Sequence, residues 1–212
     1  MAFASLLRMA SKYGYSDVRE YLFHRLKDAY PTKLEVYQAA SVLGEGVFGS
    51  PKPHPNEVLN LFLDQNVRFA IPVAAYRAGL GGFSSIISND PGLALPRLAL
   101  AAIFHGMDVI RSEVFWRAYG IVSNMSSKVC VDRKCVASCG EDSTDHKMNR
   151  LDAIYDFMVR GDKGDVLSSL SLGDVLCVDC ATTAEEGYDR LRATIWENLP
   201  CIFRVGKSWE EL

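Results

Sequence analysis

Five of the six cysteines lie in two short polar segments, at spacings that can bind a metal ion. Cys130, Cys135 and Cys139 fall within ten residues, and Cys177 and Cys180 form a Cys-Val-Asp-Cys pair about forty residues later. Zinc takes four thiolate or imidazole ligands in a tetrahedron, and a Cys-x2-Cys turn directs both of its sulfurs at one centre. The two clusters therefore predict a zinc clamp that ties two distant parts of the chain together.

The spacing alone leaves the first half of this site ambiguous. Cys130-x4-Cys135 and Cys135-x3-Cys139 are both tolerated in zinc sites, and His146 is near enough in sequence to replace a thiolate. Buried free thiols, or a disulfide or redox pair, are the alternatives to zinc. A redox Cys-x2-Cys normally opens a helix beside a strand, and no strand pattern surrounds Cys177. Four thiolates would fill the zinc shell and leave no position for water, so the metal would be structural.

Other groups of residues do not match a catalytic motif. The chain contains no Gly-x-Ser-x-Gly and no His-Glu-x-x-His, and its four histidines are scattered. Residues 44–49 match the glycine-rich loop of protein kinases, but no lysine lies between Lys52 and Lys128 to bind phosphates. We therefore expect a flexible linker there, a solvent-facing loop residue at His54, a packing role for Cys201, and a protein that is not an enzyme.

The elements that would position the cysteines are helices. Apolar residues recur at helical spacing through most of the chain, and no strand alternation is long enough to support a sheet. Ser16 is expected to cap the second helix, Thr182 with Glu185 has the spacing of a capping box, and Pro200 should end the last helix. The longest stripe contains Leu100, Ile103, Phe104, Met107, Ile110 and Val114.

This pattern predicts an all-α fold, a multi-helix array or bundle with a Cys-rich loop that zinc would clamp. The segment after Asn124 is polar, rich in cysteine and without periodicity. We therefore expect two domains, with residues 1–124 forming a helical domain. Residues 125–212 would form a Cys-containing helical subdomain packed on it.

Composition limits the class of protein further. The chain has 212 residues, 49% of them hydrophobic, with 23 basic and 26 acidic residues well mixed and a net charge of −3. No basic block indicates a nucleic-acid footprint, and no apolar run approaches the roughly 18 residues of a membrane span. The opening residues lack the charged start of a secretory signal, so we expect reduced thiols and an intracellular protein of the cytoplasm or nucleus.

Three stretches resemble the segment that follows the BTB/POZ fold in fungal BTB-domain proteins. The first is Leu6–Gly14 with Asp17-Val18-Arg19 and Tyr30-Pro31-Thr32, and the second is Ile71–Tyr76, similar to an "LPAAFY" helix. The third combines Leu176–Cys180 with Arg192, Trp196, Leu199-Pro200, Phe203 and Trp209. The stretches span nearly the whole chain in the family's order, but the BTB fold itself is not among these residues.

The resemblance implies a helical region that accompanies a dimerising interaction domain. It implies no catalysis, and the BTB dimer interface cannot be carried over. Within such proteins the expected ligands of a structural zinc are Cys130, Cys135, Cys177 and Cys180, with Cys139 or His146 as the substitute.

The leading hypothesis is a non-enzymatic protein–protein interaction module whose partner and oligomeric state the sequence does not identify. One alternative is a zinc-dependent, transcription-associated or nucleic-acid-associated protein, which would need a basic face. The other is a thiol-dependent enzyme that uses Cys177 or Cys180 at the start of the last helix, because a helix N-terminus favours the thiolate.

Overall fold

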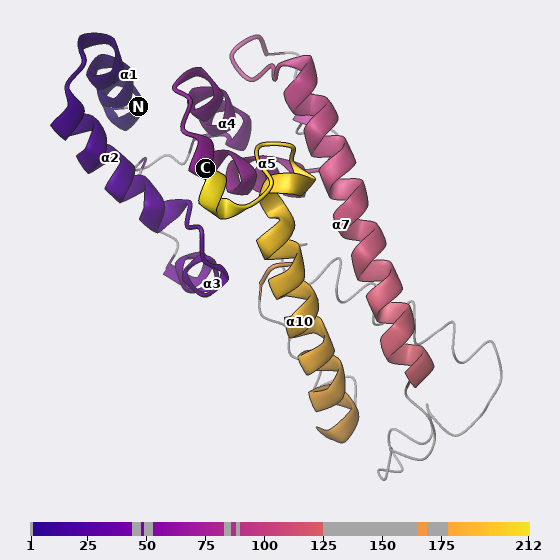
Figure 1. Cartoon of the computed structure of the whole chain (residues 1–212). Coiled ribbons are helices and arrows are strands. Elements are labelled where there is room, and N and C mark those ends of the chain that lie inside the picture. Colours follow the sequence, from indigo (N-terminus) through magenta and orange to yellow (C-terminus); the bar gives the residue numbers. More distant parts are fainter. Residues whose placement is uncertain are drawn as a thin grey trace. The chain divides into compact units, whose positions relative to one another are not determined.

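The part of the chain that the structure describes is helical. The computed structural model describes residues 2–43, 48, 53–82, 86–87, 90–124, 165–168 and 178–212, and none of these residues forms a β-strand. The α-helices are α1 (Ala2–Tyr13), α2 (Ser16–Ala29), α3 (Leu34–Leu43), α4 (Pro55–Asp64), α5 (Ile71–Leu80), α7 (Arg97–Asn124) and α10 (Val178–Ile202) (Figure 1). Short 3-10 helices, η1 (Arg68–Ala70) and η2 (Trp209–Glu211), complete the list. The predicted all-α class is thereby confirmed for these residues, and none of their helices is long and apolar enough to cross a membrane.

The chain divides into two compact units. Unit 1 comprises Met1–Met107 with Trp196–Leu212, and unit 2 comprises Asp108–Ile195. The chain's last residues thus belong to the same unit as its first. The predicted boundary between residues 124 and 125 lies at the edge of the described residues and stays a prediction.

The core of unit 1 is built in part from the faces that the helical spacing predicts. Helices α4 and α5 pack together and bury large side chains, among them Phe62 and Tyr76. Helix α1 ends where predicted, because Gly14 has a φ of +68° and Tyr15 returns its N–H to the carbonyl of Ala10. This is the bonding pattern of a Schellman cap, which favours glycine at the left-handed position. The chain therefore reverses cleanly from α1 into α2.

Two glycines allow close packing around the part of α7 that lies in unit 1. A Cβ atom added at Gly106 of α7 would lie 2.5 Å from the ring of Phe203, and one at Gly79 of α5 would lie 2.5 Å from Met107. Real Cβ atoms do not approach neighbours so closely, so a side chain at either position would force Phe203 or Met107 to move out of the present packing. The predicted stripe of α7 is buried at Ile103, Met107, Ile110 and Val114.

The N-terminal ends of α2 and α4 differ from the sequence expectations. Ser16 is the first residue of α2 rather than its cap, since the N-cap is Tyr15, which makes no side-chain cap bond. The predicted loop residue His54 instead caps α4: its Nδ1 accepts from the backbone N–H of Asn56 at 3.2 Å, while Glu57 accepts from the backbone N–H of His54. An imidazole thus replaces the hydroxyl or carboxylate that usually forms a capping box.

Helix α10 runs farther in both directions than predicted. It begins at Val178, so Thr182 lies inside it and donates its hydroxyl to the carbonyl of Val178 instead of capping the helix. It also continues through Pro200 to Ile202. Proline lacks the N–H that would bond the carbonyl four residues earlier, so an interior proline leaves that carbonyl free.

The free carbonyl belongs to Trp196, and a side chain binds it. The indole Nε1 of Trp209 donates to the carbonyl oxygen of Trp196 at 2.8 Å, and the two indole rings stack with centroids 5.3 Å apart. The carbonyl of Pro200 in turn accepts from the N–H of Val205 at 2.8 Å. The chain after α10 therefore supplies the donor that Pro200 removes, which explains why the helix does not end there.

Candidate functional site

Most of the predicted zinc ligands lie outside the described residues. This holds for Cys130, Cys135, Cys139, Cys177 and His146. Among the residues that are described, no group of three or more His, Cys, Asp or Glu side chains could hold a metal ion.

Two other cysteines lie on α10. Cys180 is in the first turn of that helix, rather than in a loop before it. The prediction that Cys201 packs in the core was wrong, because its side chain is exposed near the end of α10. The zinc site itself stays a prediction.

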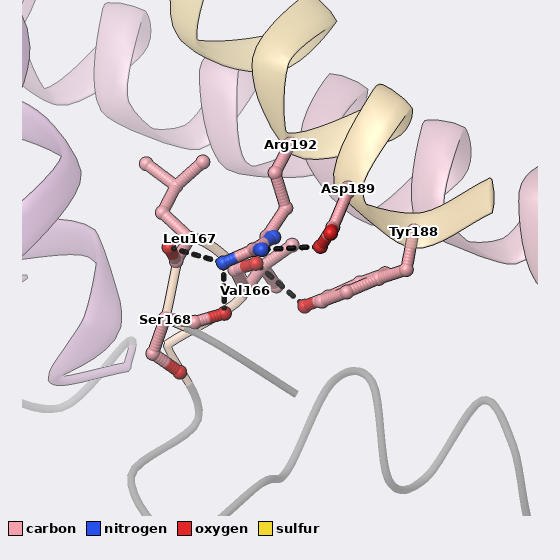
Figure 2. Close-up of polar contacts among 6 residues, drawn as sticks. All are labelled: Val166, Leu167, Ser168, Tyr188, Asp189 and Arg192. Atoms are coloured by element: carbon pink, nitrogen blue, oxygen red, sulfur yellow. Dashed lines mark hydrogen bonds and ion pairs between the residues drawn. The ribbon is translucent and has the colours of Figure 1, made fainter. Parts of the chain in front are cut away.

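The best-defined polar site of unit 2 centres on Arg192 of α10 (Figure 2). Its side chain is only 7% exposed, and its guanidinium faces the turn formed by residues 165–168. One terminal nitrogen of the guanidinium donates to the carbonyl of Ser168 at 2.9 Å and, at a longer 3.5 Å, to that of Leu167. The other forms an ion pair with Asp189, one helical turn earlier. A buried cation thereby binds the C-terminal carbonyls of the turn.

The same turn is held from two further directions. The hydroxyl of Tyr188 donates to the carbonyl of Val166, as the dashed line in Figure 2 shows. Within the turn, the Asp165 carboxylate accepts from the N–H of Leu167 at 3.0 Å, and its backbone carbonyl accepts from the hydroxyl of Ser168 at 2.7 Å. These contacts fix the turn's position against α10 in unit 2.

The electrostatics of this site favour a neutral tyrosine beside a charged arginine. Burial raises the pKa of Tyr188 above its usual value, and the positive charge of Arg192 opposes that rise only in part. A tyrosine that holds its proton so firmly is a poor general base near neutral pH, where catalysis requires a group that exchanges protons readily. The contacts of Arg192 and Tyr188 go to backbone carbonyls, so the arrangement positions a segment of chain.

Arg192 belongs to the residues of the family resemblance, but its role was not predicted. A signal was nevertheless present in the sequence. Arg192 lies four residues after Tyr188 and four before Trp196, in the middle of an apolar helical stripe. A buried guanidinium needs acceptors for its N–H groups, so a cation at that position predicts nearby carbonyls or carboxylates.

Unit 1 contains a second connected site, which is aromatic. The indole Nε1 of Trp196 donates to the backbone carbonyl of Thr32 at 3.0 Å. Its ring contacts that of Tyr37 with centroids 5.2 Å apart, and Tyr37 contacts Tyr76 of α5 at 6.4 Å. Trp209 also stacks on its ring, so Trp196 joins α10 both to the segment of Thr32 and Tyr37 and to the chain that follows the helix.

A cation lies within this aromatic site. The guanidinium of Arg77 is over the ring of Tyr30, 4.8 Å from its centroid, and over that of Tyr37 at 5.3 Å. Such cation–π contacts strengthen as water is excluded from them. Burial raises the pKa of Tyr30, and the charge and hydrogen bond of Arg77 act in the opposite direction. The pair fixes the end of α2 against α5.

Comparisons with known proteins identify no relative. No family model matches the chain, and neither the curated proteins nor the solved structures contain a match. The geometry of its own residues is therefore the basis for a proposed function.

Proposed function

We propose that this chain is a non-enzymatic protein–protein interaction module of the cytoplasm or nucleus. In this proposal it corresponds to the helical region that follows the BTB fold in fungal BTB-type adaptors. A structural zinc would be bound by Cys130, Cys135, Cys177 and Cys180, with Cys139 or His146 as a substitute ligand.

The observation that supports this proposal most is that residues of the three resembling stretches are connected, directly or through one intervening ring, in one core. Thr32 of the first stretch accepts from Trp196 of the third. Tyr76 of the second reaches Trp196 through the ring of Tyr37. Short motifs that are distant in the sequence but joined in one core are expected of a shared scaffold. Their side chains contact backbone carbonyls and aromatic rings, which is the chemistry of a framework that presents surfaces to partners.

The zinc part of the proposal draws support from the position of Cys180. Cys180 lies in the first turn of α10, nine residues before Asp189, and Arg192 is on the same helix. Arg192 and Tyr188 hold the turn that ends at Ser168, and Cys177 follows Ser168 by nine residues. Ser168 is thus bound to α10, and Cys177 directly precedes that helix in the sequence. A metal ion bound to Cys177 and Cys180 would join the start of α10 to the segment that carries Cys130 and Cys135.

Metal content and stability test the zinc. We expect one zinc ion per purified chain, and a large loss of thermal stability on chelation, because metal binding contributes directly to folding. Replacing Cys177 and Cys180 together by serine should abolish the metal, while Cys201→Ser, at an exposed position on the same helix, should retain it. A chain that carries no metal, or equal zinc in both variants, would contradict the proposal.

Photo-crosslinking tests the interaction module. A photoreactive phenylalanine would be placed at exposed apolar positions, Leu98 and Trp116, and at the exposed polar position Glu197 as the control. In an extract of the source organism we expect one discrete adduct with another protein, identified by mass spectrometry, from an apolar position and none from Glu197. Adducts that are absent at every position, or equal at all three, would argue against the proposal.

The thiol-dependent enzyme is the second candidate, because the first turn of α10 is where a thiolate is favoured. Labelling with a thiol reagent separates it from zinc. Fast labelling of Cys180 that chelation does not change supports the enzyme. Protection that is lost on chelation supports the clamp, and Cys201, exposed in both cases, provides the reference rate.

A further inference from the structure

Exposed apolar side chains are concentrated at the N-terminal helices. Of the thirteen large hydrophobic residues exposed among the described residues, six lie between positions 6 and 21. Their exposed fractions run from 42% for Val18 to 65% for Tyr21. We call this set the N-terminal apolar surface; it consists of Leu6, Met9, Tyr13, Tyr15, Val18 and Tyr21. Monomeric proteins scatter such residues singly, so a local concentration indicates an interaction surface.

Helix α1 is apolar on two sides. Leu7 and Ala10 are buried and account for the packing of this helix within unit 1. Leu6, Met9 and Tyr13 follow one another at spacings of three and four residues, so they share a second side, which is exposed. Burial within the unit explains the first side only.

Exposed apolar residues are also present at the start of α2. The rings of Tyr13 and Tyr15 lie with centroids 6.2 Å apart across the Gly14 turn, and Val18 and Tyr21 follow one turn apart on α2. Tyrosine and methionine are enriched in the cores of protein interfaces. The composition of the N-terminal apolar surface is therefore that of an interface.

The charges beside this surface are self-complementary. Helix α1 carries the exposed cations Arg8 and Lys12 and no acidic residue. The first half of α2 carries the exposed carboxylates of Asp17 and Glu20. A surface that pairs α1 with a second α1 would bring four cations together, whereas one that pairs α1 with the α2 of another molecule would bring opposite charges together.

We propose that the N-terminal apolar surface binds a second copy of this chain, with α1 of each copy packed on α2 of the other. In a two-fold dimer, if a residue of one copy contacts a given residue of the other, the reverse contact also exists. The cations of α1 and the carboxylates of α2 satisfy this condition in both directions. The inference deepens the proposed interaction module, resting on it only for the general role, and it involves neither zinc nor the crosslinking positions used to test that role.

Sedimentation and light scattering of the purified full-length chain test the dimer. We expect the mass to rise from 23.5 kDa towards twice that value as concentration increases over about 1–100 µM, a range typical of modest affinities. Met9→Glu and Tyr21→Glu should each weaken association at least tenfold. Tyr119→Glu, the same change at an exposed apolar residue outside the surface, should leave it unchanged.

Charge reversal makes the test specific. Arg8→Glu with Lys12→Glu makes these two positions of α1 acidic like Asp17 and Glu20 of α2, and Asp17→Lys with Glu20→Lys makes all four positions basic. Each double variant alone should remain monomeric, because both contacts then join like charges. An equimolar mixture should form heterodimers, and added salt should weaken them. Far-UV circular dichroism confirms that each variant folds, as expected for exposed positions.

Three outcomes would overturn the inference: a wild-type chain that stays monomeric at every concentration, glutamate variants that dimerise like wild type, and a mixture that stays monomeric. None of these outcomes alters the metal content or the adducts with other proteins. Failure of the dimer is therefore distinguishable from failure of the interaction module.

Discussion

Replacing Trp209 by phenylalanine removes the donor that satisfies the carbonyl of Trp196 inside α10. Phenylalanine keeps an aromatic ring against Trp196 but has no N–H, and Pro200 cannot donate in its place. A buried carbonyl without a partner costs about 1–3 kcal/mol, and that of Trp196 is partly buried. We therefore expect Trp209→Phe to lower the free energy of unfolding by about 1–2 kcal/mol, to which the lost indole contacts contribute a smaller part.

Pro200→Ala supplies the missing N–H from within the helix and so provides the rescue. In that background the carbonyl of Trp196 already accepts the ordinary helical bond, so Trp209→Phe should cost less than about 1 kcal/mol. The double-mutant cycle should give a coupling energy of about 1–2 kcal/mol between the two positions. Urea unfolding followed by far-UV circular dichroism measures all four proteins, with attention to the linear slope, because a changed slope signals a loss of two-state behaviour.

The control is Trp116→Phe, the same substitution at an exposed tryptophan of α7. Its effect should stay within about 0.5 kcal/mol, as is usual for surface substitutions. A coupling energy of zero between Pro200 and Trp209 would refute the explanation given for the interior proline. So would a Trp209→Phe variant as stable as the wild type.

Three further predictions concern single positions, each measured by the free energy of unfolding. Arg192→Ala should cost about 1–3 kcal/mol, because the carbonyls of Leu167 and Ser168 lose the buried guanidinium that binds them, whereas Arg190→Ala at an exposed position should cost little. Stability should fall as pH rises above the ordinary tyrosine pKa of 10.0, because the raised pKa of Tyr188 keeps the folded state protonated while the unfolded state ionises. Gly106→Ala should destabilise by about 1–3 kcal/mol through overpacking, whereas Gly120→Ala, with open space around it on the same helix, should stabilise by up to about 1 kcal/mol.

Each of these predictions has an outcome that would contradict it. Equal losses for Arg192→Ala and Arg190→Ala would mean that the buried contacts of Arg192 contribute nothing. An alkaline decline that is undiminished in Tyr188→Phe would assign the pH dependence to other groups, Tyr30 first among them, because burial raises its pKa too. Similar effects at Gly106 and Gly120 would show that the ring of Phe203 can move away at little cost.

The helices and their buried faces could be predicted from the sequence because both follow from local spacing. Ile103, Met107, Ile110 and Val114 recur with the helical period and are buried, and Gly14 ends α1 where predicted. These features depend on residues within one or two turns of each other. Side-chain periodicity and glycine chemistry are sufficient for them.

The remaining differences come from contacts between residues distant in sequence or of unusual type. Pro200 stays inside α10 because Trp209 replaces its N–H, and no local rule anticipates that donor. His54 caps α4 although histidine is not among the preferred caps. Cys201 is exposed despite its apolar neighbours, because α10 continues past Pro200 and sets which side it faces.

The candidate sites were only partly predictable. The zinc ligands Cys130, Cys135 and Cys177 remain predictions from spacing. Arg192 could have been recognised as a cation in an apolar stripe, but the carbonyls that it binds lie more than twenty residues earlier, beyond any periodic pattern. The N-terminal apolar surface was hidden for a different reason. An apolar stripe at helical spacing is normally assigned to the buried core, so the sequence does not distinguish the exposed stripe of Met9 and Tyr13 from a buried one.

The composition of unit 1 has a consequence for biosynthesis. Its two segments, Met1–Met107 and Trp196–Leu212, are separated by the 88 residues of unit 2, Asp108–Ile195. Translation at roughly 5–20 residues per second needs about 4–18 seconds to cover that distance. During this interval the carbonyl of Thr32 lacks its contact with Trp196, and the side of α7 at Gly106 lacks its contact with Phe203. Trp209, which binds the carbonyl of Trp196, is synthesised later still. We therefore expect the nascent chain to expose apolar surface until residues 196–212 have been synthesised, which makes it a substrate for chaperones on the ribosome.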